Sequence, residues 1–451
     1  MNPNIFREYD IRGITEEEIS KEDVVKIGKA YGTLLHRQNR NIVSVGRDCR
    51  QTSEEYAFLF TKGIISTGCD VVDIGVCPTP VLYFSVQHLG LGGGAMVTAS
   101  HNPPEYNGFK LLSGPDSIHG EGLQEILSII EKGCYLNGQG TIETRDMITP
   151  YQDYILDNVQ LSKPIKAGID AGNGTGGLTA LPVLNKLGCE VHDIFCDPDG
   201  TFPNHEADPT QKKNMLDLIS LVTENQLDLG VGYDGDGDRI GIVDKNGRMI
   251  YGDQLMVIYA REILQRKPGA TFISEVKCSM VMYDDIRKNG GNAIMWRTGH
   301  SLIKKKMKEE NAVLAGEMSG HMFFKDRYLG YDDALYATCR LLEIMADTGL
   351  GIDELIADLP ETYTTPEIRV DCPDDIKFNV VEKIIHQFKS KQKVIDIDGL
   401  RAIYEDGWGL VRASNTQPAL VLRFEARSEN RLMEIKTEIE TALDEIIKET
   451  A

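Results

Sequence analysis

Apolar runs of two kinds alternate along the first 146 residues. Segments 41–48, 70–76 and 94–99 are short, hydrophobic and bounded by polar or glycine-containing turns, which predicts strands. Segments 54–68 and 81–90 carry apolar residues at helical spacing and end at a glycine, which predicts helices. Strands and helices that alternate in this way build a largely parallel, doubly wound sheet.

The same alternation begins again near residue 163 and once more near residue 252. The tail differs, because one helical pattern is followed by three strand-like runs and a long charged helix. We therefore predict an α/β protein in which three related doubly wound units precede a C-terminal α+β domain. The expected domains are residues 1–146, 147–248, 249–361 and 362–451.

Length and charge narrow the class of protein. A chain of 451 residues is too long for a single core. Its 48 basic and 69 acidic side chains give a formal charge of −21, which disfavours nucleic acid and anionic membranes as partners. If the substrate is an anion, basic groups must be gathered locally to bind it.

Cysteine usage and the first residues bear on the compartment. The nine cysteines form no CxxC pair and are odd in number, as expected for free thiols in a reducing compartment. The opening "MNPNIFREYDIRG" has no apolar signal segment, and no apolar run is long enough to cross a bilayer. These features predict a soluble, cytoplasmic protein.

The first stretch with candidate chemistry is "TASHNP", residues 98–103. It places the hydroxyl of Ser100 beside the imidazole of His101, where a predicted strand gives way to a loop. Reacting groups are often found at such positions, because a rigid scaffold can aim an exposed side chain. An ordinary turn is the alternative, since Ser, Asn and Pro all favour turns.

The second stretch is "DGDGDR", with Asp234, Asp236 and Asp238 at alternate positions. Carboxylates this close repel one another unless a cation lies between them, and oxygen ligands favour Mg²⁺ or Ca²⁺. A calcium EF-hand is excluded, because its glycine and glutamate positions hold Arg239 and Lys245. A solvated acidic turn remains the alternative to a magnesium site.

The third stretch is "AGEMSGH", in which Glu317, Ser319 and His321 alternate. A spacing of two places all three on one side of an extended loop, where they suit hydrogen bonding to vicinal hydroxyls such as those of a sugar. A polar surface loop explains the same residues, and the pattern alone does not decide between the two.

The fourth stretch is "RASNTQP", which lies between two predicted strands. A guanidinium, two hydroxyls and an amide can all donate to phosphate oxygens, and arginine can do so with two parallel bonds. The stretch is a candidate phosphate loop, with a simple hairpin turn as the alternative. Its donors are Arg412, Ser414, Asn415 and Thr416.

Single basic residues add weaker signals. Arg12, Lys110, Lys277 and His300 lie in the short segments "YDIRG", "NGFK", "EVKCS" and "TGHSLIK". Each is equally compatible with an ordinary surface position, and His300 also with a structural role at a helix start.

A different function is suggested by "GNGTGG", residues 172–177, which satisfies a dinucleotide-binding pattern between a predicted strand and helix. Asp193 follows about 20 residues later, as such a site requires. An NAD-dependent dehydrogenase leaves the aspartate triplet unexplained, however, and a tight turn needs the same small residues.

The four stretches in this order resemble the α-D-phosphohexomutases, most closely the bacterial phosphomannomutase/phosphoglucomutase group. The resemblance covers the whole chain, with one stretch in each predicted domain. It implies four domains around a central cleft, Mg²⁺ as cofactor, and interconversion of hexose 1-phosphate and hexose 6-phosphate through a hexose 1,6-bisphosphate. We expect a monomer or a weak homo-oligomer.

The resemblance also implies a role for each candidate residue. Ser100 would be a phosphoserine that carries the phosphoryl group and also contacts the metal, with His101 beside it. Asp234, Asp236 and Asp238 would hold Mg²⁺, with Arg239 adjacent. Acid–base or electrostatic help would come from Lys110, Arg12 and His300. Substrate contacts would come from Tyr9, Lys277, Glu317, Ser319, His321, Arg412, Ser414, Asn415 and Thr416.

Substrate choice stays open at this point. Met318 within "GEMSGH" is more similar to the mannose and glucose enzymes than to a phosphoglucosamine mutase, which is the alternative enzyme. A non-catalytic sugar-phosphate binding protein is the alternative of a different class, but binding alone gives no reason for Ser100.

Overall fold

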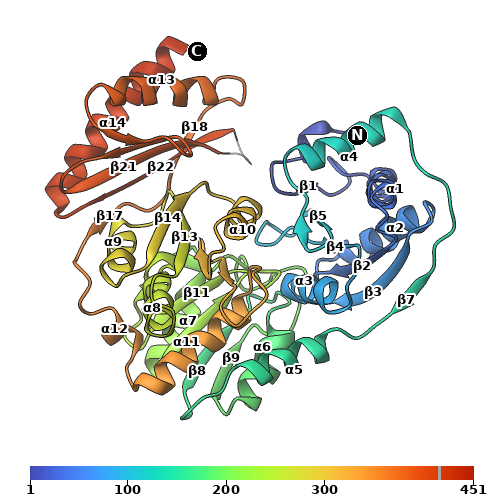
Figure 1. Ribbon diagram of the computed structural model, residues 1–451, viewed down its shortest axis with the longest axis horizontal. Coiled ribbons are helices and arrows are strands. Elements are labelled where there is room, and N and C mark those ends of the chain that lie inside the picture. Colours follow the sequence, from blue (N-terminus) through green and yellow to red (C-terminus); the bar gives the residue numbers. More distant parts are fainter. Residues whose placement is uncertain (415–417, 451) are drawn as a thin grey trace.

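The structure is a computed structural model that describes residues 1–414 and 418–450. Four sheets follow one another along the chain, each flanked by helices (Figure 1). The expected fold class is confirmed, because three α/β units precede a C-terminal unit with an antiparallel sheet. No helix in the described part of the chain is both long and apolar enough to span a membrane.

The first unit contains a seven-stranded sheet in the order β1-β5-β4-β2-β3-β7, with β6 beside β5. Strands β4, β2, β3 and β7 run parallel, whereas β5 is antiparallel to β4. Its strands are β1 (Ile11–Ile14), β2 (Ile42–Arg47), β3 (Asp70–Val76), β4 (Gly93–Val97), β5 (Tyr106–Ser113), β6 (Asp116–Ser117) and β7 (Ile142–Thr144). Its helices are α1 (Lys21–Arg37), α2 (Ser53–Ile65), α3 (Thr79–His88) and α4 (Glu121–Lys132), and α5 (Ile148–Asn158) leads onward.

The second and third units repeat the central part of this topology. In each unit the first strand lies between the second and the third strand, and all three run parallel. The fourth strand is antiparallel and pairs with the third. The second unit has β8 (Lys166–Asp170), α6 (Gly177–Lys186), β9 (Glu190–Ile194), α7 (Leu216–Glu224), β10 (Leu229–Tyr233), β11 (Ile240–Asp244) and β12 (Met249–Ile250). The third has α8 (Gly252–Arg266), β13 (Thr271–Glu275), α9 (Met280–Lys288), β14 (Asn292–Trp296), α10 (His300–Glu309), β15 (Leu314–Gly316), β16 (Met322–Phe324), α11 (Ala334–Thr348) and α12 (Ile352–Leu355).

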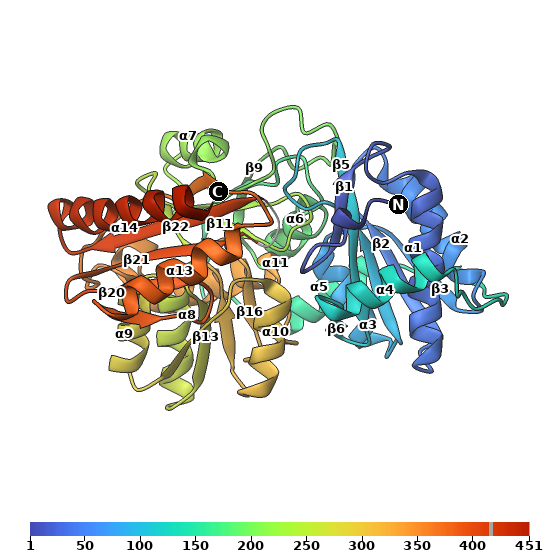
Figure 2. The same cartoon turned by 90° about the horizontal axis from the view of Figure 1, so that it is seen from above.

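The C-terminal unit is an antiparallel sheet covered by two helices. Its strands run β17-β22-β21-β20-β19, with β18 also paired to β22. The elements are β17 (Tyr363–Thr364), β18 (Ile368–Asp371), α13 (Lys377–Lys389), β19 (Lys393–Ile395), β20 (Leu400–Ile403), β21 (Gly407–Ala413), β22 (Ala419–Ala426) and α14 (Glu429–Thr450). Figure 2 shows α13 and α14 side by side over this sheet, as their mutual contacts require.

The hydrophobic cores show how tightly the units are joined. One large core runs without interruption from α3 of the first unit through the second unit into the third. The outer side of the first sheet packs separately against α1, α2 and α4. The C-terminal unit has a core of its own and meets the third unit through a small cluster of Val276, Trp408 and Leu410. The first three units therefore form a continuous body, and the fourth is joined to it by a smaller apolar contact.

Candidate active site

Three of the four predicted loops occupy the same place in their units. Each connects the third parallel strand with the antiparallel strand beside it, as in β4–β5, β10–β11 and β15–β16. The fourth loop connects β21 and β22. The structure brings the first three loops into direct contact, because Ser100 bonds to Asp234 and Arg239 bonds to His321.

Ser100 lies in the turn three residues beyond the end of β4, in a backbone conformation that residues other than glycine rarely adopt. Its φ angle is +52°, and its amide donates to the hydroxyl of Thr98 at 2.8 Å. The Ser100 side chain reaches Asp234 Oδ2 at 2.7 Å and His101 Nδ1 at 3.0 Å. Strained conformations of this kind cluster at reacting positions, where the surrounding structure holds them in place.

Arg50 holds the backbone around Ser100 in place, and its side chain is fully buried. The Arg50 guanidinium donates to the carbonyl oxygens of Ser100 at 2.8 Å, Asn102 at 2.6 Å, Pro103 at 2.6 Å and Tyr106 at 3.1 Å. Its Nε donates to Asp48 at 3.1 Å. One side chain thus fixes the backbone on both sides of the serine.

The aspartate loop is completely shielded from solvent. Asp234, Asp236 and Asp238 are each 0% exposed, and each offers a carboxylate oxygen within 4.8 Å of the others. Lys110 of β5 donates to Asp236 at 2.6 Å and to Asp238 at 2.5 Å, and Thr79 donates to Asp236 at 2.6 Å. The loop is not the solvated turn that the sequence left open.

Electrostatics show that this loop needs further positive charge. Burial, with the neighbouring carboxylates Asp238 and Asp236, raises the pKa of Asp234 well above its usual value. Burial also opposes ionisation of Asp236, but Lys110 outweighs it and lowers the pKa of that carboxyl. The cations Lys110 and Arg239 offset only two of the three carboxylates, and oxygens Oδ1 of Asp236 and Asp238 have no hydrogen-bond partner. The donor set therefore fits a divalent cation such as Mg²⁺.

The glycine-rich stretch that resembled a dinucleotide motif has a structural role beside this loop. Thr175 donates its amide to the carbonyl of Gly235 at 3.0 Å. A Cβ on Gly174 would lie 2.6 Å from that carbonyl oxygen, and a Cβ on Gly235 would lie 2.4 Å from the carbonyl oxygen of Ser100. The backbone of the aspartate loop is thus packed between the serine loop and residues 172–177, which leaves no room for a pyrophosphate.

The third loop differs from the extended segment that we expected. Gly320, with φ +92°, donates its amide to the carbonyl of Glu317, which makes a tight turn. Ser319 donates to Glu317 at 3.0 Å, and Gly299 donates to the same carboxylate at 2.9 Å. His321 points elsewhere, because its Nε2 accepts a hydrogen bond from Arg239 Nε at 2.9 Å. The extended-loop prediction was wrong since alternating polarity cannot distinguish a strand from a short hairpin.

The predicted basic residues lie around the same junction. Arg12 donates to Asn102 of the serine loop at 2.6 Å and pairs with Asp10 at 2.5 Å. His300 begins α10, and its ring lies edge-on to Tyr9, whose hydroxyl donates to the carbonyl of Thr298 at 2.7 Å. Tyr9 therefore joins the first unit to the third. His101 and His300 have their pKa values lowered well below the usual range, chiefly by burial.

Asp398 connects the fourth loop to the third unit. This carboxylate accepts from Arg412 Nε at 2.9 Å and from the amide of Thr298 at 3.1 Å, so it joins the C-terminal unit to the start of α10. Lys277 pairs with Glu367 at 3.3 Å across the same boundary. Ser414 is buried, and its carbonyl accepts from Lys377. The predicted contacts Asn415 and Thr416 lie outside the described residues.

Comparison with known proteins decides the family. Sequence profiles of the phosphoglucomutase/phosphomannomutase family match in order: α/β/α domain I at residues 3–135, domain II at 149–247, domain III at 251–363 and the C-terminal domain at 367–442. The chain belongs to the phosphoglucomutase/phosphomannomutase family. It is therefore an enzyme of the mutase class, and neither a dehydrogenase nor a phosphoglucosamine mutase is favoured.

Individual members of the family are similar over nearly the full chain. The phosphomannomutase/phosphoglucomutase of Pseudomonas putida is 43% identical over 98% of this chain and 95% of its own length. A phosphoglucomutase of Neisseria meningitidis is 40% identical over 98% and 97%. A crystal structure of a phosphoglucomutase/phosphomannomutase family protein from Burkholderia thailandensis superposes with a TM-score of 0.92 at 39% identity, covering 99% and 98%.

Several residues that build this phosphohexomutase site were not found from the sequence. Arg50, Asp332 and Asp398 lie in stretches that have the composition of ordinary turns, and their contacts with Ser100, His321 and Thr298 form only in the folded chain. The one feature they share is that each is a charged residue outside the named strands and helices. That feature is shared by many surface residues, so it could not single these out.

Proposed function

We propose that this mutase interconverts the 1-phosphates and 6-phosphates of mannose and glucose, and that Ser100 carries the phosphoryl group between them. The single observation that supports this most strongly is the placement of Ser100 Oγ. It lies on a strained, buried turn, 2.7 Å from Asp234 and 3.0 Å from His101. A hydroxyl held in this way between a carboxylate loop and an imidazole suits reversible phosphorylation.

The transfer step that we propose balances without any further reactant. The bond between phosphorus and Ser100 Oγ breaks as the free hydroxyl of a hexose monophosphate bonds to phosphorus, which yields a hexose 1,6-bisphosphate. The hydroxyl proton passes to a base on the protein. The intermediate then reorients, and its other phosphoryl group passes to Ser100 Oγ. The sugar oxygen released in this step takes back the proton held by the base. Because both orientations must bind, the same contacts must recognise a sugar phosphate either way round.

The state of each ionisable group suggests how these roles are divided. Burial lowers the pKa of the His300 imidazole, so its neutral ring can accept the hydroxyl proton. Burial opposes the charge on Lys110, but Asp236 and Asp238 outweigh it and raise the pKa of that lysine, which keeps it cationic. We therefore assign the base to His300 and charge neutralisation to Lys110 and Arg12.

The cofactor is proposed from the donor set of the aspartate loop. Asp234, Asp236, Asp238 and the phosphorylated Ser100 would hold Mg²⁺, which when bound would neutralise charge on the phosphoryl oxygens. Arg239 lies beside these ligands, with its amide donating to Asp234 at 3.0 Å.

The remaining candidates are proposed as sugar and phosphate contacts. The buried carboxylate of Glu317 and the partly exposed hydroxyl of Ser319 form a pair suited to vicinal hydroxyls. Arg412 and Ser414 belong to the loop proposed to bind the distal phosphate, with Lys277 and Tyr9 near Arg412. Asn415 and Thr416 are proposed for the same loop from the family resemblance alone.

Further parts of the account are proposals of the same kind. The domain limits 1–146, 147–248, 249–361 and 362–451 rest on the strand and helix patterns along the chain. A monomeric or weakly associated state and the action on hexose phosphates rest on the family resemblance. A cytoplasmic location is supported by the nine cysteines, all of which are free thiols.

Phosphorus NMR tests the proposed reaction. Mannose 1-phosphate and glucose 1-phosphate are each incubated with enzyme, Mg²⁺ and a trace of the matching hexose 1,6-bisphosphate, with glucosamine 1-phosphate as comparison. We expect the signals of the 6-phosphates of mannose and glucose to appear. Release of inorganic phosphate alone would indicate a phosphatase, and no change in any sample would favour a binding protein.

A further inference from the structure

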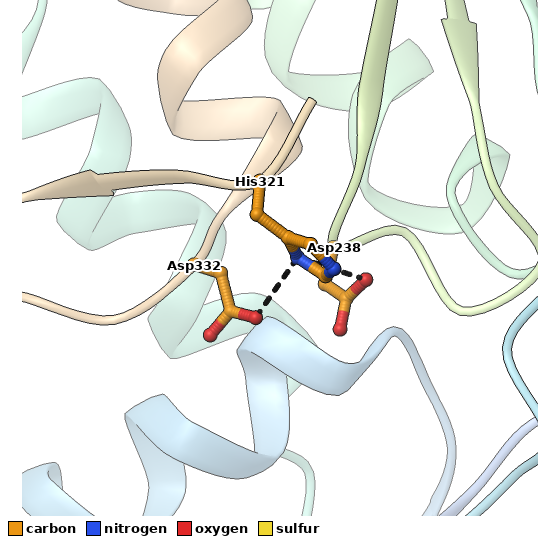
Figure 3. Close-up of side chains that lie close together, drawn as sticks. All are labelled: Asp238, His321 and Asp332. Carbon is orange, nitrogen blue, oxygen red and sulfur yellow. Dashed lines mark ion pairs between the residues drawn. The ribbon is translucent and has the colours of Figure 1, made fainter. Parts of the chain in front are cut away.

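Asp332 is a completely buried carboxylate between β16 and α11 that three cationic or titratable side chains approach. Its oxygens lie 3.0 Å from Lys304 Nζ, 3.1 Å from His321 Nδ1 and 3.9 Å from His300 Nδ1. Two of these partners are predicted site residues, yet Asp332 itself has no role in the reaction proposed above. Figure 3 shows the carboxylate facing the His321 ring, with Asp238 on the ring's other side.

The other ring nitrogen of His321 fixes the position of its proton. Arg239 Nε lies 2.9 Å from His321 Nε2. A guanidinium can only donate hydrogen bonds, so Nε2 must accept, and the ring proton must lie on Nδ1. Nδ1 faces Asp332 at 3.1 Å and Asp238 at 3.6 Å. The three side chains therefore form a directed series from Arg239 through His321 to Asp332.

Only one of the three guanidinium nitrogens of Arg239 takes part in this series. Its Nε is held by His321, whereas its two terminal amino groups form no hydrogen bond or ion pair with any described residue. The Arg239 amide is bonded to Asp234 in the aspartate loop, so the side chain starts beside the metal ligands. Two free, parallel amino groups at that place suit two oxygens of a phosphoryl group.

We propose that Asp332 is a positioning residue for phosphoryl transfer, which acts through His321 to hold the Arg239 guanidinium toward the transferring group. The proposal rests on the proposed function, because it assigns that group to the phosphoryl carried by Ser100. It also changes the role of His321, which becomes the link between Arg239 and Asp332 and not a contact of the sugar hydroxyls.

A metal ion is the competing explanation for the same cluster. Asp238, His321 and Asp332 each offer a ligand atom within 4.8 Å of the others. A metal would have to bind Nδ1, which then could not carry a proton while Nε2 accepts from Arg239. Histidine that binds a metal normally donates its other N–H to an acceptor. The Arg239 contact therefore favours a protonated Nδ1 beside Asp332 over a second metal site.

The test compares Asp332→Asn with Asp333→Asn, a control at the adjacent and equally buried position. Asp333 faces away from the site, where it accepts from the hydroxyls of Tyr151 and Tyr328 and caps α11. In Asp332→Asn, Lys304 must keep the amide oxygen, so the amide NH₂ turns toward His321. The ring proton then moves to Nε2 and repels Arg239. We expect kcat to fall about 10- to 100-fold in Asp332→Asn with KM changed less than about 3-fold, and the control to keep kcat.

A double variant separates positioning from a merely structural role. Lys304→Met in the Asp332→Asn background removes the group that fixes the amide, so the amide oxygen can turn to His321 Nδ1. We expect kcat to recover several-fold. Equal kcat in Asp332→Asn and Asp333→Asn, or no recovery in the double variant, would overturn the proposal.

Two further readouts keep the outcomes distinct. If the wild-type enzyme fails to interconvert hexose phosphates, the proposed function fails, whereas an active wild type with an active Asp332→Asn variant removes only the role of Asp332. Manganese binding followed by electron paramagnetic resonance tests the metal alternative. We expect one ion per chain in both proteins; two ions in the wild type and one in Asp332→Asn would replace the series with a second metal site.

Discussion

Ser100 and Arg50 show at the scale of single residues how the reacting group is held. A left-handed conformation costs a residue other than glycine about 1–2 kcal/mol. Four backbone carbonyls around Ser100 meet one buried guanidinium, which keeps the turn closed against that strain. Lysine at this position would present its donors from a single nitrogen and could not reach all four oxygens.

Arg50→Lys tests this arrangement. We expect kcat to fall about 10- to 100-fold, because a loosened turn misplaces the serine hydroxyl, as loss of a supporting residue does in other sites. Steady-state kinetics and the extent of Ser100 phosphorylation measure the effect. Arg47→Lys is the control, since Arg47 pairs with Asp73 at 3.3 Å and makes no hydrogen bond to the serine loop. Equal activity in both variants would show that Arg50 only fills space.

Asp236→Asn tests the metal loop. Removing this charge leaves one carboxylate fewer for Mg²⁺ and frees Lys110 from one of its two partners. We expect the Mg²⁺ concentration at half-maximal rate to rise and kcat to fall, each by about tenfold or more. The control is Asp193→Asn at the exposed residue that the dinucleotide pattern singled out. A wild-type metal response in Asp236→Asn would contradict the assignment.

The sequence predicts some of these residues and misses others for a physical reason. Ser100 and the three aspartates lie in short stretches whose composition is unusual on its own. The role of Arg50 depends on the carbonyl of Ser100, which lies 50 residues away along the chain. The role of Asp332 depends on its contacts with Lys304 and His321, which only the fold brings together. Nothing local distinguishes them from ordinary turn residues.

At the scale of elements, the repeated strand order explains why the loops meet. In each of the first three units, the loop that carries the candidate site residues connects the third parallel strand to the antiparallel strand beside it. The alternation of strand and helix patterns predicted three such units, but it could not predict this strand order, which depends on pairing across the sheet. The loops of the first two units also pack tightly at Gly235, whose backbone lies against Ser100.

Gly235→Ala tests the contact between these two loops. The new methyl group would lie 2.4 Å from the carbonyl oxygen of Ser100, so one loop must move. We expect a loss of about 1–3 kcal/mol in the free energy of unfolding and a larger loss of kcat than of substrate affinity. Gly122→Ala is the control, because its methyl would meet only the side chain of Ile118. Unchanged kcat in Gly235→Ala would show that the loops tolerate separation.

At the scale of the whole molecule, several cationic side chains of this acidic protein lie where the units meet. The chain carries a net charge of −21, yet Arg12, Lys110, Arg239, Lys277 and Arg412 all lie at that junction. Lys277 and Glu367 join the third unit to the C-terminal unit, which has its own core. The sequence predicted a distinct tail, but not this ionic link, because the two residues are 90 positions apart.

The link predicts how the C-terminal unit responds to acid. Lys277 lowers the pKa of Glu367 to about 2 from 4.5. A carboxyl group with a lower pKa in the folded state stabilises above pH 4.5, and that stabilisation, about 3 kcal/mol, is lost as the pH falls toward 2. Urea unfolding at pH 7, 4.5 and 3 measures it. We expect Glu367→Gln to lower the free energy of unfolding at pH 7. Between pH 4.5 and 3, this free energy should fall less in the variant than in the wild type. Parallel losses in the two proteins would contradict the assignment.

The most direct measurement of the central claim is the fate of a labelled phosphoryl group. Enzyme is mixed with ³²P-labelled hexose 1,6-bisphosphate, and the digested peptides are mapped by mass spectrometry. We predict that the label enters the peptide that contains Ser100, moves to unlabelled hexose monophosphate when that is added, and is absent from Ser100→Ala. Turnover that persists in Ser100→Ala, or label that stays off this peptide while hexose phosphates interconvert, would contradict the phosphoserine mechanism.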